Sequence, residues 1–427
     1  MTPTAPPDAA EFEWPDLARH LRDGDTVTWG QANAEPLTLT RALVAQRHRL
    51  GRLRLVFGIS LGGTLTADCA DAFSFVSYCA TGGNRALAQA GLLDIVPCPY
   101  SQLGAALRSG PLKIDAVLLQ VSPADDAGRH SLGLANDLLL AALDAARVVI
   151  AEVNPQVPWT HGARTLREDE IDVLVPARFP PLQTAPAEAG AIESTIARRV
   201  AALIDDGATL QVGLGGAAEA TLLQLADRRD LGLHTGIAGD AVVTLAECGA
   251  LTNARKSIDR GVGIAGLLVG SRRLHRHADR NPALQLRGSE YTHGADVLRS
   301  IDRFVALNSA IEVDLTGQVN AEVAAGRYVG AVGGAPDFLR AAHLSRGGIP
   351  VVALASMAGE RSRIVGALSG PVTTPRCDAG VFVTEHGVAD LRGLTLKARV
   401  RRMIDIAAPA QREALERGAA ASLRGPP

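Results

Sequence analysis

Six short runs of apolar residues constrain the fold of this chain most strongly, because they lack the in/out alternation of a half-exposed sheet. Strands of this kind are usually buried on both faces of a parallel sheet. Helical patterns lie between many of them, such as "NDLLLAALDAA" at 136–146 and "PDFLRAAHLSRGG" at 336–348. This order predicts an α/β fold with right-handed crossovers. The apolar runs are 53–59, 114–121, 146–153, 304–308, 349–355 and 380–385.

The length of 427 residues predicts two domains, since single cores stop growing at about 250–300 residues. A Pro- and Ala-rich stretch at 176–192 interrupts the alternation, and the order helix, strand, glycine turn, helix restarts after it. We place the joint there and expect two open α/β domains with mostly parallel sheets, residues 1–185 and 186–427. One region, 309–334, instead alternates and turns like an antiparallel meander. Ligands of such domains collect at the carboxyl ends of strands and between domains.

The composition excludes several classes of function. The hydrophobic share is 47%, the charged share 21% and the formal net charge −2, so bulk attraction to nucleic acid or anionic lipid is not expected. The Pro-rich, acidic start of the chain and the absence of any apolar run of about 18 residues predict no export signal and no membrane span. The five cysteines form no C-x-x-C pair, which indicates reduced thiols and no metal site. We therefore predict a cytoplasmic protein.

Two glycine turns are candidate ligand sites. "QVGLGGAAEATLLQL" places Gly213, Gly215 and Gly216 between a strand and a helix, where backbone N–H groups and the helix dipole can face an anion or a developing oxyanion. Ala218 occupies the third position of G-x-G-x-x-G, which weakens a dinucleotide interpretation. A second turn, "VGAVGGAPDF" at 329–338, leads into another helix. Each turn alone is equally an ordinary strand-to-helix connection, but two of them in one domain favour a functional role.

A separate motif, G-x-S-x-G, is formed by Gly58, Ser60 and Gly62 directly after an apolar strand. In an α/β-hydrolase it would be the nucleophile elbow, with Ser60 attacking the substrate. The following "TLTADCADAFSF" is a poor helix, and no later acid and histidine stand out as partners. A hydrolase that uses Ser60 is therefore a remote alternative to a chance match in a glycine-rich chain.

Six longer stretches form a set: "KIDAVLLQVSPADDAGRHSLG" (113–133), "ARVVIAEVNPQVPWTHG" (146–162), "LTNARKSID" (251–259), "LNSAIEVDLTGQVNAE" (307–322), "VGGAPDFLRAA" (332–342) and "VTEHGVADLRGLTL" (383–396). Together they resemble the acetyl-CoA hydrolase/transferase family, close to its acetate and 4-hydroxybutyrate CoA-transferases. The resemblance runs from about Asp25 to Glu413, in family order. It implies two α/β domains of CoA-transferase type, with CoA bound as a substrate mainly by the C-terminal domain and with no permanently bound cofactor.

The resemblance also implies that this chain lacks the family's nucleophile. In the family a glutamate attacks the acyl-CoA thioester, and a carboxylate suits this role because it is acylated reversibly. The matching position here is Gly236, in "HTG" where the family typically has "HTE" or "HSE". The glutamyl-CoA route cannot run from a residue without a side chain.

Three accounts of the chemistry remain open. In the first, another acid supplies the carboxylate: Asp240, which otherwise caps the next helix, or an acid from another loop. In the second, water or another small nucleophile attacks the thioester, the glycine turns stabilise the oxyanion and a histidine is the base. His234 is favoured because it lies two residues from Gly236 on the same strand face. The other acids are Glu35, Glu290, Glu312 and Glu385, and the other histidines are His161 and His386.

In the third account the protein binds CoA esters without turnover, as a sensor, partner subunit or scaffold. Ala331 and Ala335 replace a glycine and a glutamine that are usual in the family, which affects the acyl end more than CoA binding. Cys248 is expected to be a buried structural thiol. We predict an acyl-CoA-processing enzyme that acts by hydrolysis or unusual transfer on a short acyl group, with a carboxylate or other acceptor and a homo-oligomeric assembly as further expectations. CoA is expected to pass Gln211, Gly213, Gly215, Gly216, Gly333 and Gly334 towards Gly236.

Overall fold

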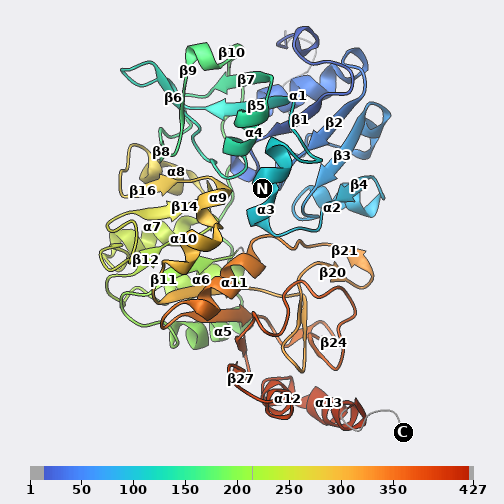
Figure 1. Ribbon diagram of the computed structural model, residues 1–427, viewed down its shortest axis with the longest axis vertical. Coiled ribbons are helices and arrows are strands. Elements are labelled where there is room, and N and C mark those ends of the chain that lie inside the picture. The colour runs from blue at the N-terminus through green and yellow to red at the C-terminus, as the bar shows by residue number, and fades with distance from the viewer. Residues whose placement is uncertain (1–13, 214, 423–427) are drawn as a thin grey trace.

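The computed structural model describes residues 14–213 and 215–422, and Figure 1 shows the N-terminal half stacked on the C-terminal half. The start of the chain (1–13), for which we expected no export signal, lies outside the described residues, as does Leu214 between two glycines of the first turn. Each half is built around one large sheet. No helix in the described ranges is long and apolar enough to cross a membrane.

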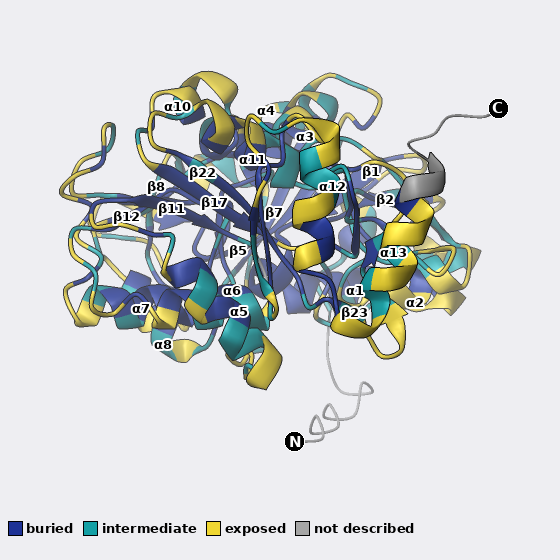
Figure 2. Ribbon diagram, turned by 90° about the horizontal axis from the view of Figure 1, so that it is seen from below, coloured by how far each residue is buried: buried dark blue, intermediate teal, exposed yellow. Residues whose placement is uncertain are grey.

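The first sheet has seven parallel strands in the order β10-β7-β5-β1-β2-β3-β4. Helices α3 and α4 cover one face, and α1 lies on the other (Figure 2). The strands are β1 (Thr26–Trp29), β2 (Leu53–Val56), β3 (Phe73–Ser77), β4 (Leu93–Ile95), β5 (Ala116–Val121), β7 (Val148–Val153) and β10 (Val173–Pro176); the helices are α1 (Leu37–Ala45), α2 (Asn84–Gln89), α3 (Tyr100–Arg108) and α4 (Leu139–Ala145).

Strand β5 shows why the apolar runs do not alternate. Val117 and Leu119 pack into one hydrophobic cluster, whereas Ala116 and Leu118 pack into another. Since successive side chains of a strand point to opposite faces, both faces of β5 are covered, and its side chains are apolar except for the buried Gln120, which accepts a hydrogen bond from Asn154 at 3.0 Å.

The second sheet has the order β12-β11-β17-β22-β26-β27, and all its pairs are parallel except β26 with β27. Figure 2 shows α5 to α8 on one side of it and α10 and α11 on the other. The strands are β11 (Thr209–Val212), β12 (Gly232–Leu233), β17 (Phe304–Asn308), β22 (Ile349–Ala353), β26 (Val381–Thr384) and β27 (Gly387–Asp390); the helices are α5 (Ala191–Ala201), α6 (Gly216–Leu223), α7 (Asp240–Glu247), α8 (Arg272–Ala278), α9 (Ser289–Thr292), α10 (Ala295–Arg299), α11 (Ala335–Leu344), α12 (Leu396–Asp405) and α13 (Pro409–Ser422).

Short strands complete the fold. The parallel trio β14-β16-β8 crosses between the halves, because β8 comes from the N-terminal half. In the 309–334 region β18 pairs with β19 and β20 with β21, all antiparallel, as the meander prediction requires. These strands are β6 (Arg129–Ser131), β8 (His161–Gly162), β9 (Thr165–Arg167), β13 (Ile237–Ala238), β14 (Gly263–Ala265), β15 (Leu267–Leu268), β16 (Leu284–Leu286), β18 (Glu312–Asp314), β19 (Val319–Asn320), β20 (Val323–Ala324), β21 (Arg327–Tyr328), β23 (Met357–Ala358), β24 (Arg361–Ser362) and β25 (Ile364–Val365).

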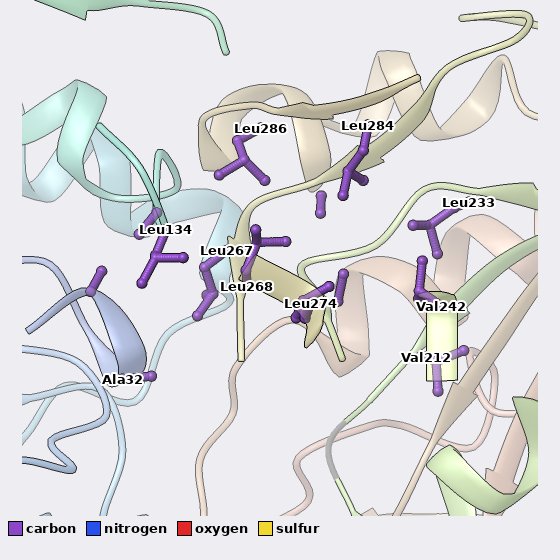
Figure 3. Close-up of a cluster of buried hydrophobic side chains, with 14 of the residues drawn as sticks. Ala32, Leu134, Val212, Leu233, Val242, Leu267, Leu268, Leu274, Leu284 and Leu286 are labelled. Carbon is purple, nitrogen blue, oxygen red and sulfur yellow. The ribbon is translucent and has the colours of Figure 1, made fainter. Parts of the chain in front are cut away.

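The two halves share one hydrophobic cluster, shown in Figure 3. Leu134 of the N-terminal half lies beside Leu267 and Leu268 of the C-terminal half, and the N–H of Leu268 donates to the carbonyl of Leu134 at 2.8 Å. The two halves are therefore joined by a shared hydrophobic core and by backbone hydrogen bonds. The α/β fold class with mostly parallel sheets is confirmed, and the boundary at 185/186 stays a prediction.

Candidate functional site

A cavity of about 460 Å³ lies where the two halves meet. Its lining includes Ile59 and Tyr78, which follow the carboxyl ends of β2 and β3, and Gly213 and Asn308, from the carboxyl ends of β11 and β17. Gly236, three residues beyond β12, lies on the same wall. The carboxyl ends of strands from both sheets thus converge on one site, as α/β folds commonly arrange for ligands.

The second glycine turn is bound to the N-terminal half by backbone hydrogen bonds. The N–H of Ala80 donates to the carbonyl of Gly330 at 2.9 Å, and the N–H of Tyr100 donates to the carbonyl of Gly333 at 3.0 Å. Gly333 has φ +58°, a left-handed conformation that glycine adopts without strain. The cavity wall is therefore continuous across the domain interface.

Gly236 faces a histidine. A Cβ on Gly236 would lie 3.0 Å from both Nε2 and Cε1 of His293 and 3.7 Å from the ring of Phe338. A Cβ on Gly334 would lie 2.5 Å from the same Nε2. The imidazole of His293 therefore fills the space into which side chains at 236 and 334 would project.

Two aromatic rings hold His293 in this place. Tyr100, from α3, has its ring centroid 4.6 Å from that of His293, and Phe338, from α11, lies at 4.4 Å. Burial of the ring, together with the nearby His234, lowers the pKa of His293 to about 3. The imidazole is therefore neutral at physiological pH.

The hydroxyl of Thr292 contacts the ring of His293 and is coupled to its tautomer. The Oγ1 of Thr292 lies 2.8 Å from Nδ1 of His293 and 3.3 Å from the carbonyl of Gly288. That carbonyl already accepts the N–H groups of Tyr291 and Thr292, each at 3.0 Å. The hydroxyl has one hydrogen: if it goes to Nδ1, Nε2 carries the ring hydrogen and is a donor beside Gly236, and if it goes to Gly288, Nδ1 carries the ring hydrogen and Nε2 is an acceptor.

A buried polar network supports this wall. The hydroxyl of Tyr100 donates to Asp137 at 2.7 Å, and the side-chain amide of Gln31 donates to the same carboxylate at 2.5 Å. The hydroxyl of Tyr78 donates to the amide oxygen of Gln31 at 2.8 Å. Burial raises the pKa of Asp137, whose carboxylate lies behind the two tyrosines and not on the cavity surface.

No aspartate or glutamate is among the described residues that line the 460 Å³ cavity. The carboxylate of Asp240 accepts hydrogen bonds from the N–H and hydroxyl of Ser271, the N-cap residue of α8, at 2.7 and 2.6 Å. The expectation that Asp240 caps its own helix is wrong, because the N-cap of α7 is Gly239 and Asp240 makes no cap hydrogen bond. Glu35 accepts the N–H groups of Leu61 and Gly62. The other predicted acids also accept hydrogen bonds from the protein: Glu290 from Arg108, Glu312 from Ser369 and Asn320, and Glu385 from Ser356.

The predicted histidines do not line this cavity either. His234 is fully buried, and its Nε2 contacts the carbonyl of Thr292 at 3.1 Å. It therefore supports the segment that carries His293, a location that argues against its acting as the base. His161 packs edge-to-face against Trp159, and His386 lies 3.5 Å from Glu385.

The glycine-turn residues divide between two neighbouring cavities. Gln211, Gly213, Gly333 and Gly334 line the large one, and the path of CoA along them stays a prediction. Gly215 lines a smaller cavity of about 130 Å³, which shares Val212, Gly213 and Ile237 with the large one and also contains Asp240. Gly216 lines neither of these two cavities.

Ser60 is not in a nucleophile elbow. Its hydroxyl donates to Glu35 at 3.2 Å, and the chain after β2 forms a loop and a short 3-10 helix at Ala67–Asp71 where an elbow requires an α-helix. The Ser60 alternative is therefore wrong for a hydrolase of that type. Cys248 is exposed at the end of α7, away from the large cavity, so the expectation of a buried thiol is wrong.

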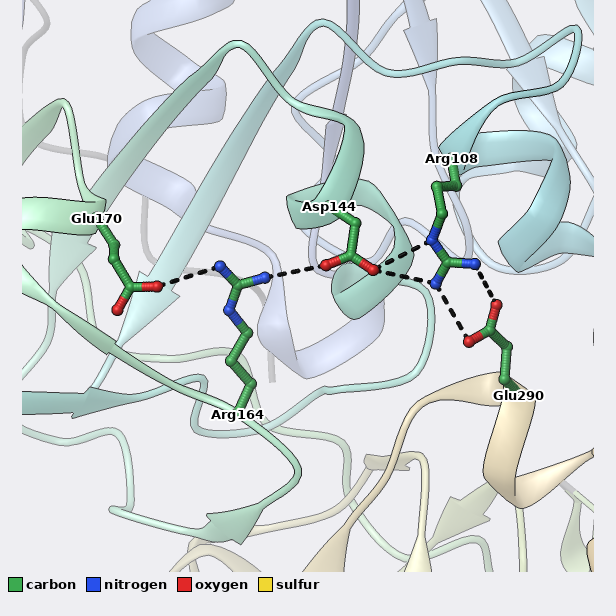
Figure 4. A network of polar contacts seen from close by, with 5 residues as sticks. All are labelled: Arg108, Asp144, Arg164, Glu170 and Glu290. Carbon is green, nitrogen blue, oxygen red and sulfur yellow. Dashed lines mark hydrogen bonds and ion pairs between the residues drawn. The ribbon is translucent and has the colours of Figure 1, made fainter.

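An ion-pair network joins α9, just before His293, to the N-terminal half (Figure 4). Arg108 of α3 contacts Glu290 of α9 at 2.5 Å and Asp144 at 3.1 Å, and Asp144 also binds Arg164 at 3.2 Å. Arg164 continues the network to Glu170 at 3.2 Å. Among the residues that the structure describes, no cluster of three or more His, Cys, Asp or Glu side chains could hold a metal ion.

Such a fold, with one cavity between two α/β halves, is that of the CoA-transferases. The solved structure of RipA from Yersinia pestis, 31% identical, has a TM-score of 0.91 over 95% of this chain and 96% of that one. The structure of 4-hydroxybutyrate CoA-transferase from Porphyromonas gingivalis, 30% identical, has a TM-score of 0.80 with the same coverage.

The chain belongs to the acetyl-CoA hydrolase/transferase family. The model of the family's N-terminal domain matches residues 12–175, and that of its C-terminal domain matches residues 270–419. The chain is also 35% identical to 4-hydroxybutyrate coenzyme A transferase from Clostridium kluyveri, over 92% of this chain and 94% of the relative. The predicted family, and an enzyme of the acetyl-CoA hydrolase/CoA-transferase kind, are confirmed.

Sequence reasoning missed His293. It lies 57 positions from Gly236 along the chain, in the segment "SEYTHG", where the sequence singled out only Glu290, and no spacing rule connects His293 with Gly236. The one signal in the sequence was the glycine at 236 itself. Because protein interiors are close-packed, the volume left by the missing side chain must be filled by another group, and a buried ring can fill it.

Proposed function

We propose that this protein releases CoA from a short-chain acyl-CoA by hydrolysis, without an acyl or CoA intermediate on a protein carboxylate. One observation carries the proposal: Gly236 lies on the wall of a ligand-sized cavity whose described lining contains no aspartate or glutamate. Acylation of the protein through a carboxylate needs such a group within reach of the thioester. In this proposal a water molecule in the cavity attacks the thioester in place of a carboxylate.

In this proposal CoA is a substrate that runs past Gln211 and the glycine turns, with its sulfur near Gly236. The glycines let the backbone approach the ligand closely, and the N–H groups of the first turn point towards anionic oxygens. The thioester carbonyl then lies beside Nε2 of His293. The cytoplasmic location and a homo-oligomeric assembly belong to the same proposal.

His293 acts here as a hydrogen-bond donor to the carbonyl oxygen. When water attacks the thioester carbon, a C–O bond forms and the carbonyl oxygen gains negative charge, which the Nε2–H group stabilises. The C–S bond then breaks, CoA leaves as a thiolate and takes up the proton of the attacking water. A neutral imidazole suits this role, because it donates without carrying a buried charge of its own.

One observation favours a second candidate, a CoA-ester-binding protein without turnover. The described cavity lining holds no acid and its one histidine is neutral, so in the tautomer with the hydrogen on Nε2 no general base is in place there. Such a site binds a thioester but activates water weakly.

The test measures free thiol released from a panel of acyl-CoA esters, with and without carboxylate acceptors, by wild type and by His293→Ala. Release without acceptor, reduced in the variant, is the expected result. Release that requires a carboxylate acceptor would establish transfer, and binding without release would establish the second candidate. Mass spectrometry of the intact protein under turnover should detect no CoA or acyl adduct on a glutamate or aspartate.

A further inference from the structure

A second cavity, of about 130 Å³, adjoins the large one. Val212, Gly213 and Ile237 line both cavities, so these three residues lie between them. Ile237 directly follows Gly236, where the proposed function places the sulfur of CoA. In that function the acyl group therefore begins beside the boundary between the two cavities.

A buried threonine holds this boundary together. The hydroxyl of Thr235 lies 3.2 Å from the carbonyl of Val212 and 3.1 Å from the carbonyl of Ile237. The same hydroxyl accepts the N–H of Val212 at 3.4 Å, and the Thr235 side chain is fully buried. One side chain thus ties the end of β11 to the start of β13, so the backbone segments that carry Val212 and Ile237 keep a fixed separation.

The small cavity offers a ligand mostly apolar surface. Leu222, Leu233 and Val242 line it and belong to the hydrophobic cluster that the two halves share, and Figure 3 shows Leu233 and Val242 near Val212. The three polar side chains of its described lining are already bonded to the protein. They are Thr184, whose hydroxyl donates to Asn33, Glu219, which accepts the N–H of Ala187, and Asp240, which accepts both donors of Ser271.

The volume of the small cavity suits the end of a hydrocarbon chain. Apolar cavities of about 150 Å³ in other proteins bind benzene, so a space of this size holds several carbon atoms. Each methylene group that moves from water into apolar surroundings strengthens binding about fourfold. An acyl chain that reached this cavity would therefore bind more tightly as it became longer.

We propose that Ile237 sets the length of the acyl chain that this protein accepts. Its side chain separates the acyl group in the large cavity from the small cavity. Without that side chain the two cavities join, and the small one takes up the hydrocarbon end of a longer straight-chain acyl group. The inference rests on the proposed function in placing the thioester of an acyl-CoA beside Gly236.

The experiment compares two uncleavable thioethers, S-butyl-CoA and S-hexyl-CoA, which differ by two methylene groups. Calorimetry measures their dissociation constants, and that of free CoA, for wild type, Ile237→Val and Ile237→Ala. Wild type is expected to bind S-hexyl-CoA no more tightly than S-butyl-CoA. Ile237→Ala should bind S-hexyl-CoA about tenfold more tightly than S-butyl-CoA, because the two added methylene groups enter the small cavity. Ile237→Val, which opens the boundary less, should show an intermediate ratio.

Two further variants separate entry into the small cavity from a simple enlargement of the large one. Val242 lines the small cavity and not the large one, so Val242→Phe in the Ile237→Ala background fills that space and should abolish the preference for S-hexyl-CoA. Ile311→Ala is the matched control, because Ile311 is half-buried like Ile237 but lines only the large cavity. It should keep the wild-type ratio of the two dissociation constants. The series at 237 and this control do not depend on the Val242→Phe variant.

Several outcomes would overturn the proposal: a wild type that already prefers S-hexyl-CoA tenfold, an Ile237→Ala variant with the wild-type ratio, or a preference that survives Val242→Phe. Weaker binding of free CoA on Val242→Phe would also overturn it, since that result assigns the small cavity to CoA itself. A wild type that binds neither CoA nor the analogues would refute the proposed function together with this inference. The analogues need no turnover, so an inactive protein whose Ile237→Ala variant prefers S-hexyl-CoA would refute the hydrolysis and leave this proposal standing.

Discussion

The Nε2 atom of His293 lies 3.0 Å from the position that a Cβ on Gly236 would occupy, so the two residues compete for one volume. Contacts of a real Cβ at that distance are tight, and the ring cannot move freely because Tyr100 and Phe338 pack against it. Restoring a carboxylate at 236 therefore requires a change at 293 as well.

The first prediction concerns that restoration. Gly236→Glu alone should fold less stably, by about 1–3 kcal/mol, because the new side chain overpacks the site against His293. Gly236→Glu combined with His293→Ala should recover most of this loss and form a CoA thioester on Glu at 236 when acyl-CoA is added. Urea unfolding and intact mass spectrometry measure the two effects. A double variant that binds CoA but never forms the adduct would count against the placement of position 236 at the thioester.

The fold was largely predictable because its strands are buried on both faces and its helices separate them. The apolar runs at 304–308 and 349–355 correspond to β17 (Phe304–Asn308) and β22 (Ile349–Ala353) with small shifts at their ends. The site was less predictable, since it depends on which loops meet across the interface. Gly236 could be located by resemblance, whereas His293 reaches it through the position of α9, and that position depends on tertiary contacts such as Arg108 with Glu290.

The second prediction separates the donor role of His293 from its packing role. His293→Asn keeps a side-chain N–H donor in a smaller group, whereas His293→Ala removes the donor. Loss of one oxyanion donor typically lowers kcat by about 100- to 1000-fold, so the alanine variant should show that loss and the asparagine variant a smaller one. The KM for acyl-CoA should change less than kcat in both variants. Equal kcat values for wild type and His293→Ala would remove His293 from the chemistry.

The third prediction concerns the ion pair between Arg108 and Glu290. Both side chains are partly exposed, so Glu290→Gln should lower the free energy of unfolding by no more than about 1 kcal/mol. It should nevertheless lower kcat several-fold, because α9 directly precedes Thr292 and His293. Asp169→Asn is the control, since it breaks the exposed pair with Arg167 away from the cavity and should leave kcat unchanged. If both variants behave alike, α9 does not depend on this pair for its position.

The fourth prediction concerns stability in mild acid. Burial lowers the folded-state pKa of His234 and His293 to about 3 and that of His275 to about 4, against an unfolded value of about 6.5. The unfolded chain therefore binds more protons than the folded one below about pH 6.5. The contribution of these three histidines to the free energy of unfolding is therefore fully present above about pH 6.5. It decreases as the pH falls from 6.5 to the folded-state pKa values of about 4 and 3. Each histidine contributes a slope of about 1.4 kcal/mol per pH unit near pH 5.

Other buried groups act in the opposite direction, such as Glu152, whose pKa burial raises to about 7. The informative quantity is therefore the difference between wild type and His293→Asn, in which the contributions of the unchanged groups cancel. Urea unfolding between pH 7 and pH 4.5 should show that wild type takes up about one proton more on unfolding than the variant does near pH 5. Identical pH slopes for the two proteins would mean that the ring at 293 is hydrated and titrates as an exposed histidine does, which contradicts its enclosure between Tyr100 and Phe338.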